Sequence, residues 1–203
     1  VAGEGKLAPV TVSLSWGPGD ADKAVYTIKS VGAKYAKVRF VLTAGADSDN
    51  GRLTISTTGR GTLKIGCVSL MPADNVDGMN PEMIEMARAL HTPVVRFGGN
   101  YTSGYHWRDG VGPLDRRVTM LNQSWGMPEY NQFGTDEFLA FCKLIGAEPQ
   151  IALNLGSGTP EEAAGWVKYV NAKWGKTGLL WELGNELWGD FQTGYPTLER
   201  AAS

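Results

Sequence analysis

TDEFLAFCKLIGAEPQIALNL, residues 135–155, is the stretch that decides the fold class. Its first half repeats apolar residues at the spacing of one helical face, at Phe138, Phe141, Cys142 and Ile145. Gly146 then ends the predicted helix, and residues 150–155 form a nearly continuous apolar run. A helix followed by such a run is typical of a parallel sheet whose strands are buried on both faces.

The same pattern occurs on both sides of this stretch. Short apolar runs lie at residues 94–97 and 179–183, and further helices begin at Asn80-Pro81 and at the capping box that opens with Thr159. The buried face predicted for the earlier helix consists of Met83, Met86, Ala87 and Leu90. The buried face predicted for the later helix consists of Ala163, Trp166, Val167 and Val170. These patterns predict an α/β fold that holds less than half of a (β/α)8 barrel, with an open sheet as the alternative.

Residues 1–72 have a different pattern. Polar and apolar residues alternate at residues 11–16, 24–28, 35–42 and 52–56, with turn-forming residues between these runs. Short strands at this spacing predict part of a β-sandwich. We therefore expect two domains: a partial sandwich at 1–72, which either braces its neighbour or binds carbohydrate, and a partial catalytic barrel at 73–203.

Composition excludes several classes of partner. The 203 residues carry a formal net charge of -2 and no run of Lys or Arg, so we expect no nucleic-acid partner. No apolar stretch approaches the roughly 20 residues that cross a bilayer, so we expect no membrane partner. The two histidines lack the spacing of zinc ligands, and we expect neither a metal nor a cofactor. An oligomer is possible, and an extracellular or periplasmic location is slightly favoured.

Polar residues follow each predicted strand of the α/β part, where barrel enzymes carry their chemistry. The sharpest motif is Gly184-Asn185-Glu186, which directly follows the last apolar run. A carboxyl group there, between Trp181 and Trp188, is placed for desolvation, which a glycosidase general acid requires. Asn185 is suited to hydrogen-bond a sugar hydroxyl. The alternative for Glu186 is a surface residue that begins a loop.

Several segments, in chain order, resemble the α-L-arabinofuranosidases of glycoside hydrolase family 51. They are MPADNVDGM (71–79), RFGGN (96–100), GYHWRDGVG (104–112), FGTDEF (133–138), GAEP (146–149), NLGSGT (154–159) and WELGNELWGD (181–190). The second segment is similar to the family motif R-x-P-G-G-N, although it lacks the proline that the family usually has. Each motif is weak alone, but the ordered set is specific.

The resemblance implies a barrel whose general acid/base ends the fourth strand, directly after an asparagine. That pair falls on Asn185 and Glu186, which makes Glu186 the predicted catalytic residue. Asn100 would line the arabinofuranosyl subsite, and the substrate would be an arabinose-containing oligosaccharide or polysaccharide. The other residues predicted to bind substrate are His106 and Trp107 in the entrance loop, and Asn154 and Trp188 after their strands. His106 could equally be a solvated loop histidine.

The family's retaining mechanism needs a second carboxyl group, a nucleophilic Glu after the seventh strand. After Glu186 the chain offers only Asp190 and Glu199, both too close in sequence, so we expect the nucleophile and the remainder of the catalytic barrel to be missing. Two other functions stay open at this point: a clan-related endo-glucanase or xylanase, and a non-catalytic carbohydrate-binding protein.

Overall fold

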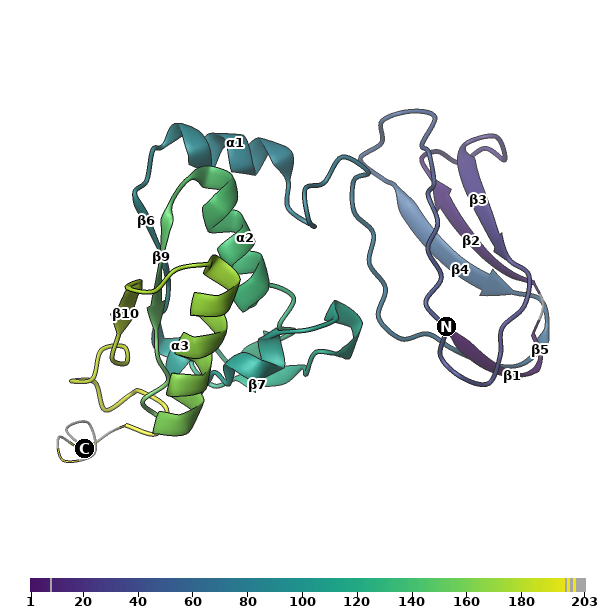
Figure 1. Cartoon of the computed structure of the whole chain (residues 1–203). Helices are drawn as coiled ribbons and strands as arrows, with labels where there is room; N and C mark the ends of the chain where they lie inside the picture. Colours follow the sequence, from purple (N-terminus) through teal and green to yellow (C-terminus); the bar gives the residue numbers. More distant parts are fainter. Residues whose placement is uncertain (8, 196, 198, 200–203) are drawn as a thin grey trace. The chain divides into compact units, whose positions relative to one another are not determined.

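Three parallel strands with helices between them organise the second of the two units of the chain (Figure 1). The computed structural model describes residues 1–7, 9–195, 197 and 199, and the units are Val1–Ala73 and Asp74–Ser203. The sheet has the order β10-β9-β6, from β6 (Val94–Phe97), β9 (Glu148–Ala152) and β10 (Leu180–Glu182). Helix α1 (Pro81–Ala89) precedes β6, while α2 (Thr135–Ile145) and α3 (Pro160–Trp174) lie between successive strands. The predicted parallel pairing is confirmed, and the described strands form an open sheet.

The two faces of this sheet have different chemistry. Phe97, Ile151 and Trp181 are aligned across the three strands, and all belong to the core cluster that α2 and α3 cover. Because side chains alternate along a strand, the neighbouring positions Arg96, Gln150 and Glu182 belong to the opposite face. The sheet thus buries aromatic and aliphatic groups under the helices and places a polar row on its other side.

Trp166 of α3 lies at the centre of the core of the second unit. Its ring contacts the rings of Phe97, Tyr105, Trp107 and Trp181, and only 2% of the residue is exposed. Its indole N–H donates to the buried Thr135 Oγ1 at 3.0 Å. Because Thr135 begins α2, this bond fixes α3 against the start of the preceding helix.

Helix α1 buries a different face from the one that its periodicity predicts. Ile84 is its buried residue and packs with Ile145 of α2, whereas Met83, Met86 and Leu90 are exposed. The prediction that these three residues are buried is wrong for the described structure. The start of the helix is as predicted, since Asn80 Oδ1 accepts from the backbone N–H of Glu82.

A long segment between β6 and α2 is held by a buried arginine. It contains three short 3-10 helices, η1 (Asn100–Gly104), η2 (Trp107–Gly110) and η3 (Leu114–Arg116), and a hairpin of β7 (Met120–Asn122) and β8 (Met127–Glu129). Arg117 pairs with both carboxylate oxygens of Glu137 at 2.8 Å and donates to the carbonyls of Gly112 and Asn131. Burial raises the pKa of Glu137, but hydrogen bonds from Arg117 and the Gly134 N–H outweigh it and lower the pKa overall.

Replacing Arg117 by methionine is expected to lower the unfolding free energy at pH 7 by about 2–3 kcal/mol, because Glu137 stays in place without its partner. The lowered pKa of Glu137 means that the pair stabilises the fold above the ordinary value of 4.5. This stabilisation is lost as the pH falls through the folded pKa, so the difference between wild type and variant shrinks there. Urea unfolding followed by tryptophan fluorescence at several pH values measures it.

The exposed neighbour Arg116 provides the matched control, and Arg116→Met should unfold like the wild type at every pH. An Arg117→Met variant as stable as the wild type at pH 7 would show that the clamp does not hold this segment.

The first unit consists of two small antiparallel sheets. One has the order β3-β2-β4, from β2 (Val10–Ser15), β3 (Lys23–Ile28) and β4 (Arg52–Thr57), and the other pairs β1 (Ala2–Lys6) with β5 (Arg60–Lys64). The strand predicted at residues 35–42 is absent from that described segment, although Phe40 still packs on Tyr26 of β3. The alternation of polar and apolar residues at 35–42 therefore identified a side chain that packs on the sheet, although this segment does not form the backbone hydrogen bonds of a strand.

No helix in the described part of the chain is sufficiently long and apolar to cross a membrane.

Candidate active site

An arginine–carboxylate pair anchors the polar face of the parallel sheet. Arg96 Nε of β6 donates to the two carboxylate oxygens of Glu182 of β10 at 2.8 and 2.9 Å, and Gln150 of β9 also donates to Glu182. The hydrogen bonds from Arg96 lower the pKa of Glu182 and outweigh the opposing effect of partial burial. Glu182 is therefore a carboxylate committed to Arg96, which makes it a poor candidate for a proton donor.

The same arginine fixes the orientation of two asparagines. Because guanidinium groups only donate, the atom of Asn185 that lies 2.8 Å from Arg96 Nη2 is the amide oxygen. Asn185 Nδ2 then points to Asn100 Oδ1, at 2.9 Å, and Asn185 is only 5% exposed. The structure thus brings together the predicted pair Asn100 and Asn185 from the loops that follow β6 and β10.

Glu186 follows this buried asparagine, but its own side chain is exposed. The desolvation that the sequence predicted for it is therefore not present around the described chain. Its backbone has a φ of 44°, in the left-handed region that residues with a Cβ rarely occupy. Gly189 N donates to the Glu186 carbonyl at 2.8 Å and helps to hold this conformation. Unfavourable backbone geometry of this kind is concentrated at functional sites.

Asn154 has a structural position after β9. It is 6% exposed, its Oδ1 accepts from the backbone N–H groups of Gly156 and Ser157, and its Nδ2 donates to the Tyr105 carbonyl and to Ser157 Oγ. The amide is thus used in closing the turn after its strand, so the packing does not support its predicted contact with substrate.

The two residues predicted in the entrance loop also contact protein groups. Trp107 is 6% exposed, stacks parallel to Trp166 with ring centres 6.4 Å apart, and donates its indole N–H to the Glu162 carbonyl. Its ring belongs to the core, and the predicted contact with a sugar is not supported. His106 Nδ1 lies 3.0 Å from each carboxylate oxygen of Glu162, and its side chain is partly exposed. His106 is therefore paired within the protein in this structure.

Trp188 lies two residues after Glu186 and is 74% exposed. Its ring meets Phe191 edge to face at 5.3 Å, and Phe191 is exposed as well. Trp188 thus has an exposed aromatic ring close to Glu186 in the sequence, which is compatible with its predicted role in substrate binding. Trp181 instead packs on Trp166 in the core.

Four members of the network were not predicted as site residues: Arg96, Gln150, Glu182 and Gln192. Three of them lie on the strands, and polar residues at alternating positions of buried strands are a signal that could have identified them. Gln192 lies in an irregular segment after β10, where no periodicity or motif marked it.

Gly98 lies directly against the guanidinium of Arg96. A Cβ at this position would lie 2.7 Å from Arg96 Cζ and 2.9 Å from its Nε. In this chain, glycine gives the guanidinium room to reach both Glu182 and Asn185.

The three loops after the strands are in direct contact at Gly156. A Cβ there would lie 2.0 Å from the Thr193 carbonyl oxygen and 2.5 Å from that of Ser103. Ser103 O also accepts from Ser157 N at 2.9 Å. Ser103 follows β6, Gly156 follows β9 and Thr193 follows β10, so a hydrogen atom in place of a side chain allows all three loops to meet.

The substitution Gly156→Ala is expected to force the backbone around Ser103 and Thr193 apart, since both close atoms are carbonyl oxygens that cannot rotate away. We expect a loss of about 1–3 kcal/mol in unfolding free energy, measured by thermal or urea denaturation. Gly32→Ala, where nothing lies within 4 Å of the added carbon, is the control and should change little. Equal stability of both variants would argue against the close contact of the loops.

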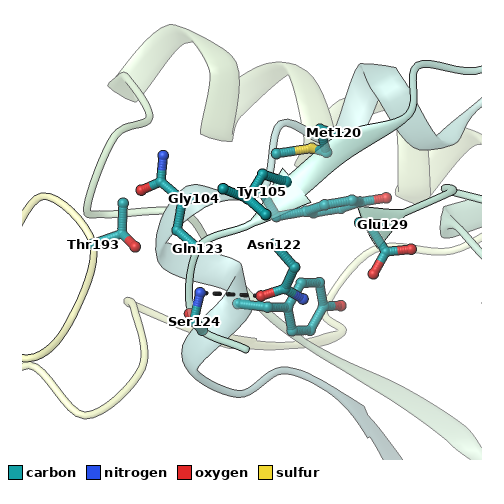
Figure 2. A pocket seen from close by; sticks show the side chains of 10 residues that line it. Gly104, Tyr105, Met120, Asn122, Gln123, Ser124, Glu129 and Thr193 are labelled. Carbon is teal, nitrogen blue, oxygen red and sulfur yellow. Dashed lines mark hydrogen bonds between the residues drawn. The ribbon is translucent and has the colours of Figure 1, made fainter. Parts of the chain in front are cut away.

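A small pocket lies beside this junction and is too small for a sugar. Figure 2 shows its lining, which includes Gly104, Tyr105, Asn122 and Thr193 and the 3.1 Å hydrogen bond from Ser124 N to Asn122 Oδ1. Its volume of about 10 Å³ has room for about one water molecule. The candidate site is therefore the open surface around Glu186 and not this pocket.

Comparison with known proteins shows which family this chain resembles in sequence and fold. The family described as "Alpha-L-arabinofuranosidase 1 domain" matches residues 86–177. The α-L-arabinofuranosidase C of Emericella nidulans is 41% identical over 147 residues, which cover 64% of this chain and 29% of that protein. The chain therefore spans under a third of the length of this curated relative.

Solved structures give the same relationship. The α-L-arabinofuranosidase of Thermotoga maritima, determined as an arabinose complex, is 37% identical with a TM-score of 0.56, over 62% of this chain and 30% of that one. The arabinose-bound MgGH51 α-L-arabinofuranosidase is similar in fold, with a TM-score of 0.68 and 16% identity over 90% of this chain and 36% of that one. Together with the ordered motifs, these matches show that the chain is similar to one part of the α-L-arabinofuranosidases of glycoside hydrolase family 51.

Proposed function

We propose that this sequence carries the acid/base part of a retaining glycoside hydrolase that releases terminal α-L-arabinofuranosyl residues from oligosaccharides or polysaccharides. The observation that carries the proposal is the convergence of Asn100, Asn185 and Glu186 after two strands of one parallel sheet. The named activities of the relatives support the choice of sugar.

Two carboxyl groups near one another have different environments. Arg96 holds Glu182 as a carboxylate. Glu186 is exposed, and among the described residues its carboxyl group accepts one long hydrogen bond, from Gln192 at 3.5 Å. A carboxylate that an arginine holds in its charged form does not readily take up and give back a proton, which a general acid and base does in each cycle. Glu186 is therefore the residue that we assign as general acid and base.

The proposed chemistry has two steps. The Glu186 carboxyl group gives its proton to the leaving oxygen while a second carboxylate attacks the anomeric carbon and forms a covalent glycosyl-enzyme. Water then attacks the same carbon, its proton passes to the Glu186 carboxylate, and arabinose leaves with retained configuration. Asn185 and Asn100 would hold hydroxyl groups of the arabinofuranosyl ring.

The second carboxylate has no candidate among the described residues near Glu186, since Glu182 is occupied by Arg96. We propose that the sheet of β6, β9 and β10 is part of a (β/α)8 barrel and that the nucleophile comes from a strand of this barrel outside the described residues. Its carboxyl group would lie about 5–5.5 Å from that of Glu186. The exposed Met83, Met86 and Leu90 of α1 would then pack against further barrel elements.

The first unit has no group that we connect with the reaction. Its strands contribute to a small apolar core around Val10, Val12 and Ile28. We propose that residues 1–72 brace the catalytic part, which leaves catalysis to residues 73–203.

The test is a substrate profile of the complete polypeptide that contains these residues. Aryl α-L-arabinofuranoside, aryl β-D-xyloside and aryl β-D-glucoside are compared, followed by arabinan and arabinoxylan with detection of free arabinose. We expect turnover of the arabinofuranoside and release of arabinose. Preferential cleavage of xylan or glucan backbones would instead favour the endo-acting alternative, and saturable binding without any turnover would favour a carbohydrate-binding protein.

A further inference from the structure

Gln192 is a buried polar residue that connects the candidate acid to the two asparagines. Only 4% of it is exposed, and its Nε2 lies 3.0 Å from Asn100 Oδ1 and 3.5 Å from Glu186 Oε2. Its Oε1 accepts from the buried Ser103 Oγ at 2.7 Å. A buried glutamine with both ends of its amide bonded in this way has a defined orientation.

The direction of the amide follows from Arg96. Since Arg96 donates to Asn185 Oδ1 and Asn185 donates to Asn100 Oδ1, the group of Gln192 that faces Asn100 must be a second donor. Its remaining N–H is then directed to Glu186. The Ser103 hydroxyl is compatible with this orientation, because it can donate its proton to the opposite end of the amide.

The backbone after β10 brings Gln192 to this place by a series of turns. Gly189 N donates to the Glu186 carbonyl, Gln192 N to the Gly189 carbonyl, and Tyr195 N to the Gln192 carbonyl, at 2.8, 3.2 and 3.1 Å. The segment therefore curls back, and a residue six positions after Glu186 contacts its carboxyl group. The contact of Thr193 with Gly156 holds the curled segment against the loop after β9.

We propose that Gln192 is a positioning residue for the general acid/base: its amide N–H holds Glu186 Oε2 and so leaves Oε1 directed to the glycosidic oxygen. This inference rests on the proposed function. The 3.5 Å contact is long, as hydrogen bonds of catalytic groups often are without substrate, and it shortens when substrate orders the carboxyl group. Arg96 thereby orients Glu186 through Asn185, Asn100 and Gln192 without touching it.

The experiment compares Gln192→Leu with wild type and Glu186→Gln in the complete polypeptide, on arabinofuranosides with different leaving groups. Departure of a poor leaving group such as an alcohol requires protonation, whereas a dinitrophenolate leaves without it. We expect Gln192→Leu to lose about 10- to 100-fold in kcat/KM on the alkyl arabinofuranoside. On the dinitrophenyl arabinofuranoside we expect a loss of less than about 3-fold, so the variant follows the pattern of Glu186→Gln in weaker form.

Ser103→Ala removes the donor that orients Gln192 and is expected to give a smaller loss with the same dependence on leaving group, even if Gln192→Leu folds poorly. The exposed Gln132→Leu is the control and should match wild type on both substrates. The positioning role would be overturned if Gln192→Leu and Ser103→Ala each lost the same factor in kcat/KM on both substrates while Glu186→Gln lost more on the alkyl arabinofuranoside. That result would leave the proposed function intact. A wild type without turnover on any arabinofuranoside would overturn the function and the role of Gln192 with it.

Discussion

Replacement of Glu186 by alanine lowers kcat/KM on alkyl and oligosaccharide arabinofuranosides by about 10²- to 10⁴-fold, the contribution expected of general acid–base catalysis. On a dinitrophenyl arabinofuranoside, whose leaving group needs no proton, the first step is nearly unaffected and the glycosyl-enzyme accumulates. Azide, which needs no general base, then attacks the intermediate and restores turnover. The product is an arabinofuranosyl azide of retained configuration, detectable by NMR.

Asp190 provides the matched control for this prediction, since it is an exposed carboxylate four residues away. Asp190→Ala should keep wild-type rates on every substrate and should not respond to azide. A loss in Glu186→Ala that is equal for all leaving groups and unchanged by azide would mean that Glu186 does not transfer the proton.

The second large effect concerns stability. Trp166→Ala removes a 98%-buried indole from contact with four other aromatic rings and leaves the Thr135 hydroxyl without its donor. Substitutions of this kind cost about 3–5 kcal/mol, a large part of the 5–15 kcal/mol by which domains are stable. We expect the unfolding temperature to fall by roughly 6–20 °C, measured by calorimetry or circular dichroism.

Trp125, which is 61% exposed at the hairpin turn between β7 and β8, provides the comparison. Trp125→Ala should change the unfolding free energy by no more than about 0.5 kcal/mol. If Trp166→Ala were as stable as Trp125→Ala, the core could not be organised around Trp166.

Periodicity predicted the helices and strands of the second unit well because burial there follows a regular geometry. The predicted faces of α2 and α3 are buried at Phe138, Cys142, Trp166 and Val170. For α1, periodicity predicted the wrong face. The spacing of apolar residues shows that they share one side of a helix, but it does not show whether a described element packs against that side. Residues 35–42 alternate like a strand, but a ladder also requires a partner, which the pattern alone does not supply.

The candidate site was predictable where a side chain follows a strand directly. Asn100 and Asn185 meet because parallel strands end at one edge of the sheet, and sequence order alone implies this. Asn154 was placed at the site on the same reasoning, and Trp107 because its loop resembles the entrance loop of the family. An amide or an aromatic ring has the same appearance in sequence whether it meets a sugar or packs within the protein. Gln192 depends on the return path of an irregular segment, which no local pattern encodes.

The close contact at Gly156 has a consequence for evolution and engineering. Because Ser103, Gly156 and Thr193 come from loops that follow three different strands, a change of length or shape in one loop is transmitted to the other two. These loops should therefore be exchanged between related proteins as a set. A single transferred loop would not pack correctly against the two resident loops, whereas the three loops transferred together would keep their contacts at Gly156.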